Sequence, residues 1–405
     1  MIDPRNTVLG KVLLSIHEFI QKEKSGGLAL GISVIAAIIL ANSPWQDAYF
    51  NFLQNRLALF VNDEPFIDLD VSHWINDGLM SIFFFVVGLE LKKEIVAGEL
   101  RQPRKALLPI LAAIGGMIFP ALIYVSLNSQ PEVLHGWGIP MATDIAFALG
   151  VLYLLGSRVP VALKVFLTAV AIVDDLGAVL VIALFYTSDI SILNLGIGLG
   201  MLGVMFLANR MGIRNVVFYA ILGIGGVWTL FLLSGVHATI AAVLAAFMIP
   251  ADVKINEEIF TARVKKHLSR FQQADPNHFP TLTKEQLFIL QRMAVDNKKA
   301  IPPLQRLEFR LQPLVTFVVL PIFALANAGV SFADISMEIL LENHVALGVG
   351  LGLLVGKVMG IFGFTWLSAK FNIASFPTGM DIKNLFGLSL LGAIGFTMSL
   401  FITQL

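Results

Sequence analysis

The sequence predicts an all-α, polytopic membrane protein, and three observations support this fold class. Of the 405 residues, 57% are hydrophobic and only 14% are charged, whereas a soluble protein carries about a quarter of its residues as Asp, Glu, Lys and Arg. The mean hydropathy is +0.80. Uncharged apolar stretches of roughly 18 residues or more, long enough to cross a bilayer as a helix, recur along the whole chain. Most of the surface is therefore expected to face lipid.

Composition also excludes several classes of function. The formal net charge is 0, so the overall charge does not attract nucleic acid. Cys is absent, which excludes disulfides, thiolate metal sites and a cysteine nucleophile. The first 24 residues are polar and amphipathic, without an apolar run followed by a small-residue cleavage site. We therefore expect the N-terminus to be retained.

Eleven spans are predicted from the apolar stretches. Their approximate bounds are 25–43, 71–91, 106–127, 136–155, 161–187, 190–208, 215–232, 235–250, 313–330, 345–368 and 384–405. The long apolar run 215–251 is divided in two because Ser234 and Gly235 favour a turn. Between the first two spans, segment 44–70 is acidic, and the alternation at 66–70 predicts a short hairpin strand.

The distribution of Lys and Arg predicts the orientation of these spans. With the N-terminus in the cytoplasm, 26 of the 28 Lys and Arg residues lie in cytoplasmic segments, leaving Arg56 outside and Lys357 within a span. Cytoplasmic connections are enriched in Lys and Arg in this way. The chain is thus interpreted as one transmembrane domain, 1–405, with a cytoplasmic loop at 251–312. That loop contains helix-like stretches near 257–271 and 284–299 and a turn at 275–280.

Charged residues within the spans are the first candidates for function. The spans contain Asp77, Glu90, Asp144, Asp174, Asp175 and Lys357. A charged side chain at mid-membrane costs roughly 2.5–3.5 kcal/mol on insertion scales, so each must pair, line a hydrated cavity or be neutral. Asp174 and Asp175 are adjacent at the middle of the fifth span, where neighbouring side chains point about 100° apart. This pattern indicates an ion or proton site and leaves the ion open.

Two spans carry signals of interruption. The fourth contains Thr143-Asp144, and the eleventh contains Gly392-Ala-Ile-Gly395-Phe-Thr397-Met-Ser399. Thr and Asp compete for backbone hydrogen bonds and disfavour a helix interior, and unwound backbone in a membrane is tolerated only inside protein or beside a cavity. Paired interruptions in the two halves of a chain are typical of a transporter site.

Lys357 and His237 are the remaining candidates within the apolar segments. Lys357 lies about twelve residues from either end of span 345–368, too far inside to reach the headgroups easily. Pairing with Asp174 or Asp175, or with the negative ends of interrupted helices, is favoured over snorkelling to the interface. His237 lies near a helix start on the outer side, where a structural role is favoured over proton sensing.

Several motifs closely resemble the NhaA-type sodium/proton antiporters of bacterial inner membranes. They are Ala142-Thr143-Asp144-Ile-Ala-Phe-Ala-Leu-Gly150, Ala171-Ile-Val-Asp174-Asp175-Leu-Gly177, Gly235-Val-His237-Ala-Thr239, Trp74-Ile-Asn-Asp77-Gly, Gly88-Leu-Glu90-Leu-Lys-Lys-Glu94, Ala324-Leu-Ala-Asn327-Ala-Gly329 and Gly395-Phe-Thr-Met-Ser399. These motifs follow the order of the family over nearly the whole chain. Their combination is highly specific.

The resemblance implies an inverted-repeat fold in which the fourth and eleventh helices are discontinuous and cross near mid-membrane. It implies that Asp175 is the principal ligand of transported sodium or lithium and alternates between ion and proton. Asp174 is the partner carboxylate and pairs with Lys357 in the proton-bound state. Asp144 lies at the crossing with Thr143 and offsets the helix dipoles.

The resemblance further implies pH sensing at Glu90, Glu94, Glu308 and His237, where two family histidines near this region correspond to Phe309 and Gln312. It implies substrate ions rather than cofactors, a lipid bilayer as the environment, no nucleic acid, and a possible homodimer. Segment 254–300 is interpreted as an insertion between the eighth and ninth helices. The sequence ends at Leu405, after the eleventh span, without the twelfth helix of the family.

Two other functions would use similar residues. A sodium-coupled symporter on a related fold would use similar interrupted helices and would also respond to an organic substrate. An intramembrane aspartyl protease needs acids on two helices that face one peptide bond, which Asp144 and Asp175 would imitate. The Gly-x-Gly-Asp context of such proteases is absent, and pairing with Lys357 would occupy one acid.

Overall fold

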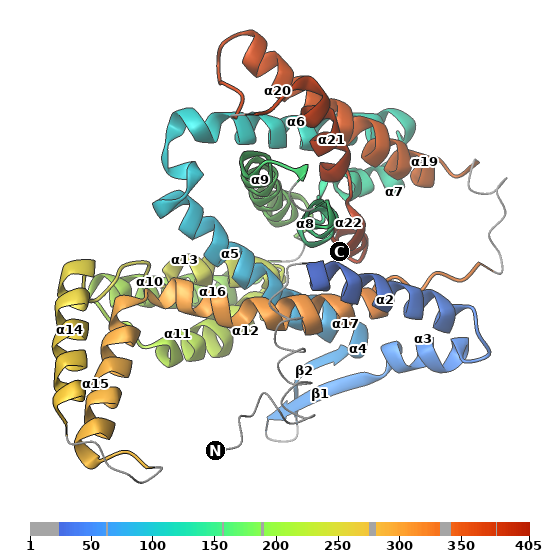
Figure 1. Cartoon of the computed structure of the whole chain (residues 1–405). Coiled ribbons are helices and arrows are strands. Elements are labelled where there is room, and N and C mark those ends of the chain that lie inside the picture. Colours follow the sequence, from blue (N-terminus) through green and yellow to red (C-terminus); the bar gives the residue numbers. More distant parts are fainter. Residues whose placement is uncertain are drawn as a thin grey trace.

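The computed structural model describes residues 24–61, 64–155, 158–187, 190–274, 281–332, 342–377 and 379–405. Residues 1–23 of the predicted cytoplasmic N-terminus and the predicted turn at 275–280 lie outside these ranges. Figure 1 shows two groups of helices, one above the other. The upper group contains α6, α8, α9 and α19–α22, the lower group contains α2, α10–α13, α16 and α17, and α5 runs between the groups.

Helical elements occupy each of the predicted spans in the described part of the chain. In the first half they are α2 Lys24–Ala41, α3 Gln46–Gln54, β1 Arg56–Val61, β2 Glu64–Asp70, α4 Val71–His73, η2 Trp74–Leu79, α5 Met80–Ala97, η3 Glu99–Arg101, α6 Pro103–Leu127, α7 Pro131–Leu134, η4 His135–Met141, α8 Ile145–Leu154 and α9 Val161–Phe185. In the second half they are α10 Ile192–Arg210, α11 Val216–Leu222, η6 Gly223–Trp228, α12 Thr229–Leu233, α13 Ala238–Met248, α14 Glu257–Gln273, α15 Lys284–Ala300, α16 Pro303–Leu314, η7 Val315–Val319, α17 Leu320–Asn327, α19 His344–Leu351, η8 Gly352–Lys357, α20 Val358–Lys370, α21 Ile382–Gly392 and α22 Phe396–Thr403.

The described part of the chain contains 7 helices that are long and apolar enough to cross a membrane, or up to 8 when the bent pair α2 and α3 counts as one span. The chain is therefore a helical, multi-pass membrane protein. Three predicted spans, 71–91, 136–155 and 235–250, are not among these helices: 136–155 is broken at 142–144, and 235–250 is helical over the 11 residues of α13. The count of eleven spans stays a prediction.

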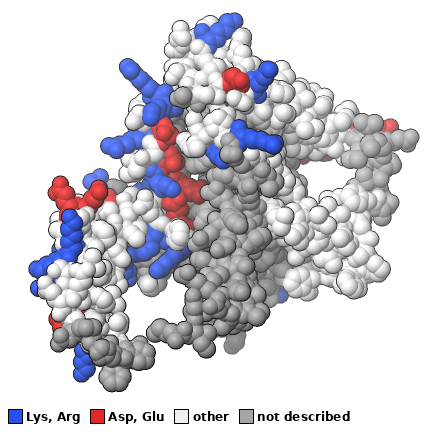
Figure 2. All heavy atoms as spheres, in the orientation of Figure 1, with Lys and Arg blue, Asp and Glu red and all other residues white. Residues whose placement is uncertain are grey.

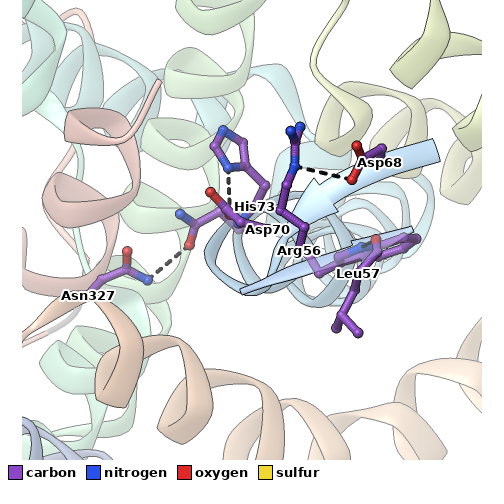
Figure 3. A network of polar contacts seen from close by, with 8 residues as sticks. Arg56, Leu57, Asp68, Asp70, His73 and Asn327 are labelled. Atoms are coloured by element: carbon purple, nitrogen blue, oxygen red, sulfur yellow. Dashed lines mark hydrogen bonds and ion pairs between the residues drawn. The ribbon is translucent and has the colours of Figure 1, made fainter. Parts of the chain in front are cut away.

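The acidic segment before the second predicted span forms the expected hairpin. Strands β1 and β2 pair antiparallel with an irregularity between Leu59 and Phe60. Figure 3 shows Arg56 reaching across to Asp68, at 3.2 Å, and His73 turned back onto Asp70, at 2.7 Å. The Asp70 carboxylate also accepts the His73 backbone N–H and so caps α4. The hairpin is thereby joined directly to the helix that follows it.

The two helices of the predicted insertion coincide with α14 and α15, which pack chiefly against each other. Asp296 of α15 is buried in their seam and accepts Nη1 of Arg263 at 3.0 Å and Nε2 of His267 at 3.2 Å. Burial raises the pKa of the Asp296 carboxyl, but the hydrogen bonds and charges of Arg263 and His267 outweigh it, so the pKa lies below its ordinary value. An ionised Asp296 therefore offsets basic charge inside the hairpin.

The upper group is held by close helix packing around α6. A Cβ added to Gly360 of α20 would collide with the backbone of Gly115 of α6, and one added to Gly356 would lie 2.8 Å from Pro120. Small residues at such crossings let helix backbones approach each other in a membrane. This packing fixes the position of η8, and hence of Lys357, against the rest of the upper group.

Candidate functional site

The candidate site lies where α8, α9, η8 and α22 meet in the upper group of helices. Asp174, Asp175, Asp144 and Lys357 are all at most 1% exposed, and Thr143 is equally buried. The structure thus brings together the five residues that the sequence assigned to the ion site and to the crossing of the interrupted helices.

Both predicted interruptions are present in the chain's geometry. Helix η4 ends at Met141 and α8 begins at Ile145, while α21 ends at Gly392 and α22 begins at Phe396. The two breaks contact each other directly. The Asp144 backbone N–H donates to the Ile394 carbonyl at 2.7 Å, and the Thr143 hydroxyl donates to the Gly392 carbonyl at 2.8 Å. Backbone groups freed by one break are therefore satisfied by the other.

Asp144 caps the N-termini of both half-helices. Its Oδ1 accepts the Phe147 backbone N–H of α8 at 2.9 Å. Its Oδ2 accepts the Thr397 backbone N–H of α22 at 3.1 Å and the Thr397 hydroxyl at 2.5 Å. Helix N-termini carry partial positive charge and unsatisfied N–H groups, so one carboxylate compensates two of them.

Lys357 occupies the complementary position at a C-terminal end. Its Nζ lies 2.7 Å from Oδ2 of Asp174 and also donates to the carbonyl of Met141, the last residue of η4. The ammonium group thus meets a carboxylate and the negative end of a helix dipole together. Lys357 is fully buried, and its ammonium group has these two protein partners.

Asp175 differs from the other acids of the site. Neither of its carboxylate oxygens has a hydrogen-bond partner among the residues that the structure describes, and the same holds for Oδ1 of Asp174 and Oγ of Ser399. Burying a carboxylate anion without partners costs much free energy. Such a group is therefore expected to bind a proton or a cation. Across the described ranges, no three His, Cys, Asp or Glu side chains gather in a way that would hold a resident metal ion.

A cavity of about 180 Å³ adjoins the site between α5, α8, α9 and α16. Its lining includes Glu90, Glu94 and Glu308, as well as Lys93, which pairs with Glu308 at 2.6 Å. It extends to Ile145 and Ile172, which lie one and three residues from Asp144 and Asp175. The acids of the predicted pH sensor therefore share one cavity, whose wall also includes sequence neighbours of Asp144 and Asp175.

His237 lies apart from this cavity. It precedes α13, where its Nε2 is 3.0 Å from the Tyr186 carbonyl. Of the two residues at the family's histidine positions, Gln312 lines the cavity, while Phe309 is 79% exposed. The structure thus gathers three of the four predicted sensor residues and leaves His237 elsewhere.

Two further side chains belong to the site although the sequence reasoning gave them no role. Thr397 binds Asp144, and Lys93 pairs with Glu308. Thr397 follows Gly395 within the predicted weak spot of the eleventh span, which was a usable signal. In the sequence, Lys93 lies between the predicted sensor acids Glu90 and Glu94. Its positive charge was a signal that it pairs with one of the sensor acids.

We expect Thr397→Val to destabilise the protein by about 1.5–3 kcal/mol, the range for a hydrogen bond to a charged group. Valine keeps the shape and the backbone N–H but leaves Asp144 without the hydroxyl donor. The measurement is the thermal unfolding midpoint in detergent. Thr403→Val on the same helix is the matched control, because the Thr403 hydroxyl donates only to the Ser399 carbonyl. Equal midpoints for the two variants would contradict the role given to Thr397.

Comparisons with known proteins agree on one family. A family model described as Na+/H+ antiporter 1 matches residues 17–405. The Na(+)/H(+) antiporter NhaA 1 of Saccharophagus degradans is 47% identical over 397 residues, 98% of this chain and 85% of that protein. The Na(+)/H(+) antiporter NhaA of Christiangramia forsetii is 43% identical over 400 residues, 98% of this chain and 89% of that protein.

Proposed function

The chain belongs to the Na+/H+ antiporter 1 family, and from this membership we propose that it exchanges cytoplasmic sodium or lithium ions for external protons. The relatives that are named Na(+)/H(+) antiporters align with 98% of this chain. The finer parts of the proposal are the ion selectivity, the residues that bind the ions and the placement in a bacterial inner membrane with the N-terminus in the cytoplasm.

The buried Asp175 carboxylate, without a protein partner among the described residues, carries the proposal. In a low-dielectric site a lone carboxylate must be neutralised, either by a proton or by a monovalent cation. One carboxylate that accepts either ligand, and not both together, makes them compete. Loading sodium then requires release of a proton, which is the elementary step of antiport.

Asp174 and Lys357 form the partner half of the proposed site. With the proton on Asp175, the Lys357 ammonium neutralises Asp174 at 2.7 Å. When sodium reaches Asp175, the free Oδ1 of Asp174 supplies a second carboxylate oxygen at the adjacent position of α9. Oxygen ligands suit small, hard alkali ions. Two carboxylates and one lysine permit the release of more protons than sodium ions bound.

The contacts between the two helix breaks support the crossing of discontinuous helices that the family resemblance implies, and an inverted-repeat fold is part of the proposal. Asp144 and Thr143 hold the crossing together, and Asp144 offsets the positive ends of α8 and α22. Small shifts of either half-helix would then move the backbone beside Asp175, which lies on α9. A homodimer is part of the proposal as a family expectation.

The acid-lined cavity is proposed as the cytoplasmic approach and as the place where pH acts. Glu90, Glu94 and Glu308 attract cations toward the carboxylates, and protonation of these acids would weaken that attraction. His237 is proposed to act separately, through the start of α13. Gradients drive the exchange: one pH unit supplies about 1.4 kcal/mol per proton, and 100 mV about 2.3 kcal/mol per net charge moved. No chemical cofactor is part of this secondary active transport.

The two other functions have less support. A protease would need Asp144 and Asp175 to share one peptide bond, yet Asp144 already accepts three hydrogen bonds from the helix starts. A symporter shares the interrupted helices, but the relatives at 43–47% identity are named antiporters.

Everted membrane vesicles containing the protein test the proposal. After respiration acidifies the interior, we expect NaCl and LiCl, but not KCl, to dequench a pH-sensitive dye. Each sodium or lithium ion that enters through the protein is exchanged for protons that leave the vesicle. Vesicles from cells without the gene are the control. Equal responses to all three salts, or none above the control, would reject the proposed ion exchange. A sodium response that requires an added organic solute would favour the symporter.

A further inference from the structure

The α14–α15 hairpin is fixed beside the cytoplasmic ends of two membrane helices. The Leu304 backbone N–H, at the start of α16, donates to the Pro250 carbonyl just after α13, at 3.1 Å. The Lys254 backbone N–H donates to the Lys299 carbonyl at 3.0 Å, which closes the base of the hairpin. Because both ends are held in this way, the base of the hairpin lies within a few residues of the ends of α13 and α16.

Its direction follows from Figure 1. The long helices α16 and α17 run from left to right, whereas α14 and α15 run from top to bottom at the left edge and extend past α11. Helix α15 is the one nearer to α16. The hairpin therefore crosses the direction of α16 and extends past α11, beyond the lower edge of the helix bundle in this view.

One face of α15 has an unusual composition for a polar excursion. We call it the α15 outer face and define it by Lys284, Leu287, Phe288, Gln291, Val295 and Lys298, all exposed and opposite the buried seam residues Gln286, Ile289 and Asp296. Leu287, Phe288 and Val295 are 47–54% exposed. The face contains no acidic residue. Large apolar side chains flanked by lysines are the pattern of helices that lie in a membrane interface.

The net positive charge of the hairpin favours an anionic partner for the α15 outer face. Segments 254–274 and 281–300 carry 9 Lys and Arg against 4 Asp and Glu. Figure 2 shows most of the Lys and Arg side chains over the left and upper parts of the molecule, the hairpin included, and few at the lower right. The cytoplasmic leaflet bears anionic lipids that attract such basic segments by about 1 kcal/mol per Lys or Arg. An acidic protein surface would pair with the lysines. It would not offer the apolar surroundings that Leu287, Phe288 and Val295 find between lipid headgroups and acyl chains.

We propose that the α15 outer face docks on the anionic phospholipid headgroups of the cytoplasmic leaflet. Leu287, Phe288 and Val295 enter the boundary between headgroups and acyl chains, and Lys284 and Lys298 bind lipid phosphates. Arg292, whose guanidinium lies 5.0 Å from the centre of the Phe288 ring, borders the same face. The hairpin thereby links the α13–α16 connection, next to Glu308 of the acid-lined cavity, to the lipid composition around the protein.

The chain has no Cys, so single cysteines can carry an environment-sensitive nitrobenzoxadiazole dye on the full-length protein. Gln291→Cys places the dye on the α15 outer face. Ser269→Cys, exposed on the far side of α14, is the matched control. Both are measured in detergent, in phosphatidylcholine vesicles and in vesicles that also contain phosphatidylglycerol. Both leaflets then have one composition, so the insertion direction does not matter.

We expect a blue shift at position 291, but not at 269, in the phosphatidylglycerol vesicles, and its reduction by high salt. Lys284→Glu with Lys298→Glu should lower the ratio of docked to undocked hairpin at least about tenfold, given the attraction per basic residue. Lys265→Glu with Lys266→Glu on α14 is the charge-matched control. An unshifted 291 signal, or an equal shift in neutral and anionic vesicles, overturns the proposal. The readout involves no ion transport, so it is independent of the proposed exchange.

Discussion

Asp175→Asn is expected to abolish sodium-dependent proton flux in proteoliposomes while the protein remains folded. Asparagine has nearly the same shape, but it neither accepts a proton at physiological pH nor neutralises a cation. Because both Asp175 oxygens lack a protein partner among the described residues, the substitution breaks no protein hydrogen bond that the structure shows. We therefore expect loss of transport without the loss of stability that most buried substitutions cause.

The measurement pairs two readings on the same preparation. Sodium-driven proton flux is followed with a pH dye, and the thermal midpoint is followed in detergent with and without sodium. For the unchanged protein, competition at one carboxylate predicts that each tenfold rise in proton concentration raises the apparent KM for sodium by up to tenfold. Asp175→Asn should remove both this dependence and the flux.

Ser389→Ala is a suitable control for the purification and reconstitution. Ser389 is fully buried in α21, and its hydroxyl donates only to the Leu385 carbonyl four residues earlier. We expect its flux to match the unchanged protein. Exchange at a normal rate in Asp175→Asn would refute the central part of the proposed mechanism, whatever the family of the chain.

The sequence singles out the candidate site residues because charge inside a membrane is costly and therefore conspicuous. Asp174, Asp175, Asp144 and Lys357 are the deepest charged residues of the predicted spans, and the structure buries all four together. Residue patterns alone left the partner of Lys357 open between Asp174, Asp175 and the negative ends of the interrupted helices. Asp174 and Asp175 point about 100° apart on their helix, so the partner depends on where Lys357 lies. The packing of η8 against α6 sets that position, which hydropathy does not reveal.

Other features were less visible in the sequence for physical reasons. Threonine is a common residue in membrane helices, so Thr397 does not stand out in the sequence. Its hydroxyl contacts Asp144 only because the two helix breaks meet in the folded structure. The span predicted at 313–330 corresponds to a helical run that begins at Pro303, because α16 continues into the polar segment that hydropathy assigns to the loop. The α15 outer face was missed since its residues alternate with polar ones.

Lys357→Ala is expected to cause a larger loss of stability than Thr397→Val or Asp175→Asn. Removing one partner of a buried ion pair costs about 3–5 kcal/mol, because the other charge remains buried without compensation. Here the loss has a second component. The carbonyl of Met141, at the end of η4, also loses its donor, so the C-terminal end of the broken helix is left uncompensated as well.

A double-mutant cycle separates these components. Asp174→Asn alone leaves the ammonium without its carboxylate, and the combination with Lys357→Ala removes both charges of the pair. If the 2.7 Å contact is a true ion pair, the double variant should be less destabilised than the sum of the single variants. The remaining loss then measures the Met141 contact and the cavity left by the lysine stem.

The control for this cycle lies on the same helical run. Lys370, at the exposed end of α20, contacts the Trp366 ring at 4.7 Å, and Lys370→Ala should change the thermal midpoint in detergent by little. Strictly additive losses in the cycle would show that Lys357 and Asp174 do not interact. A midpoint for Lys357→Ala equal to that of Lys370→Ala would show that the buried lysine does not hold the interrupted helices together. The ion site would then have to be organised by Asp144 and Thr397 alone.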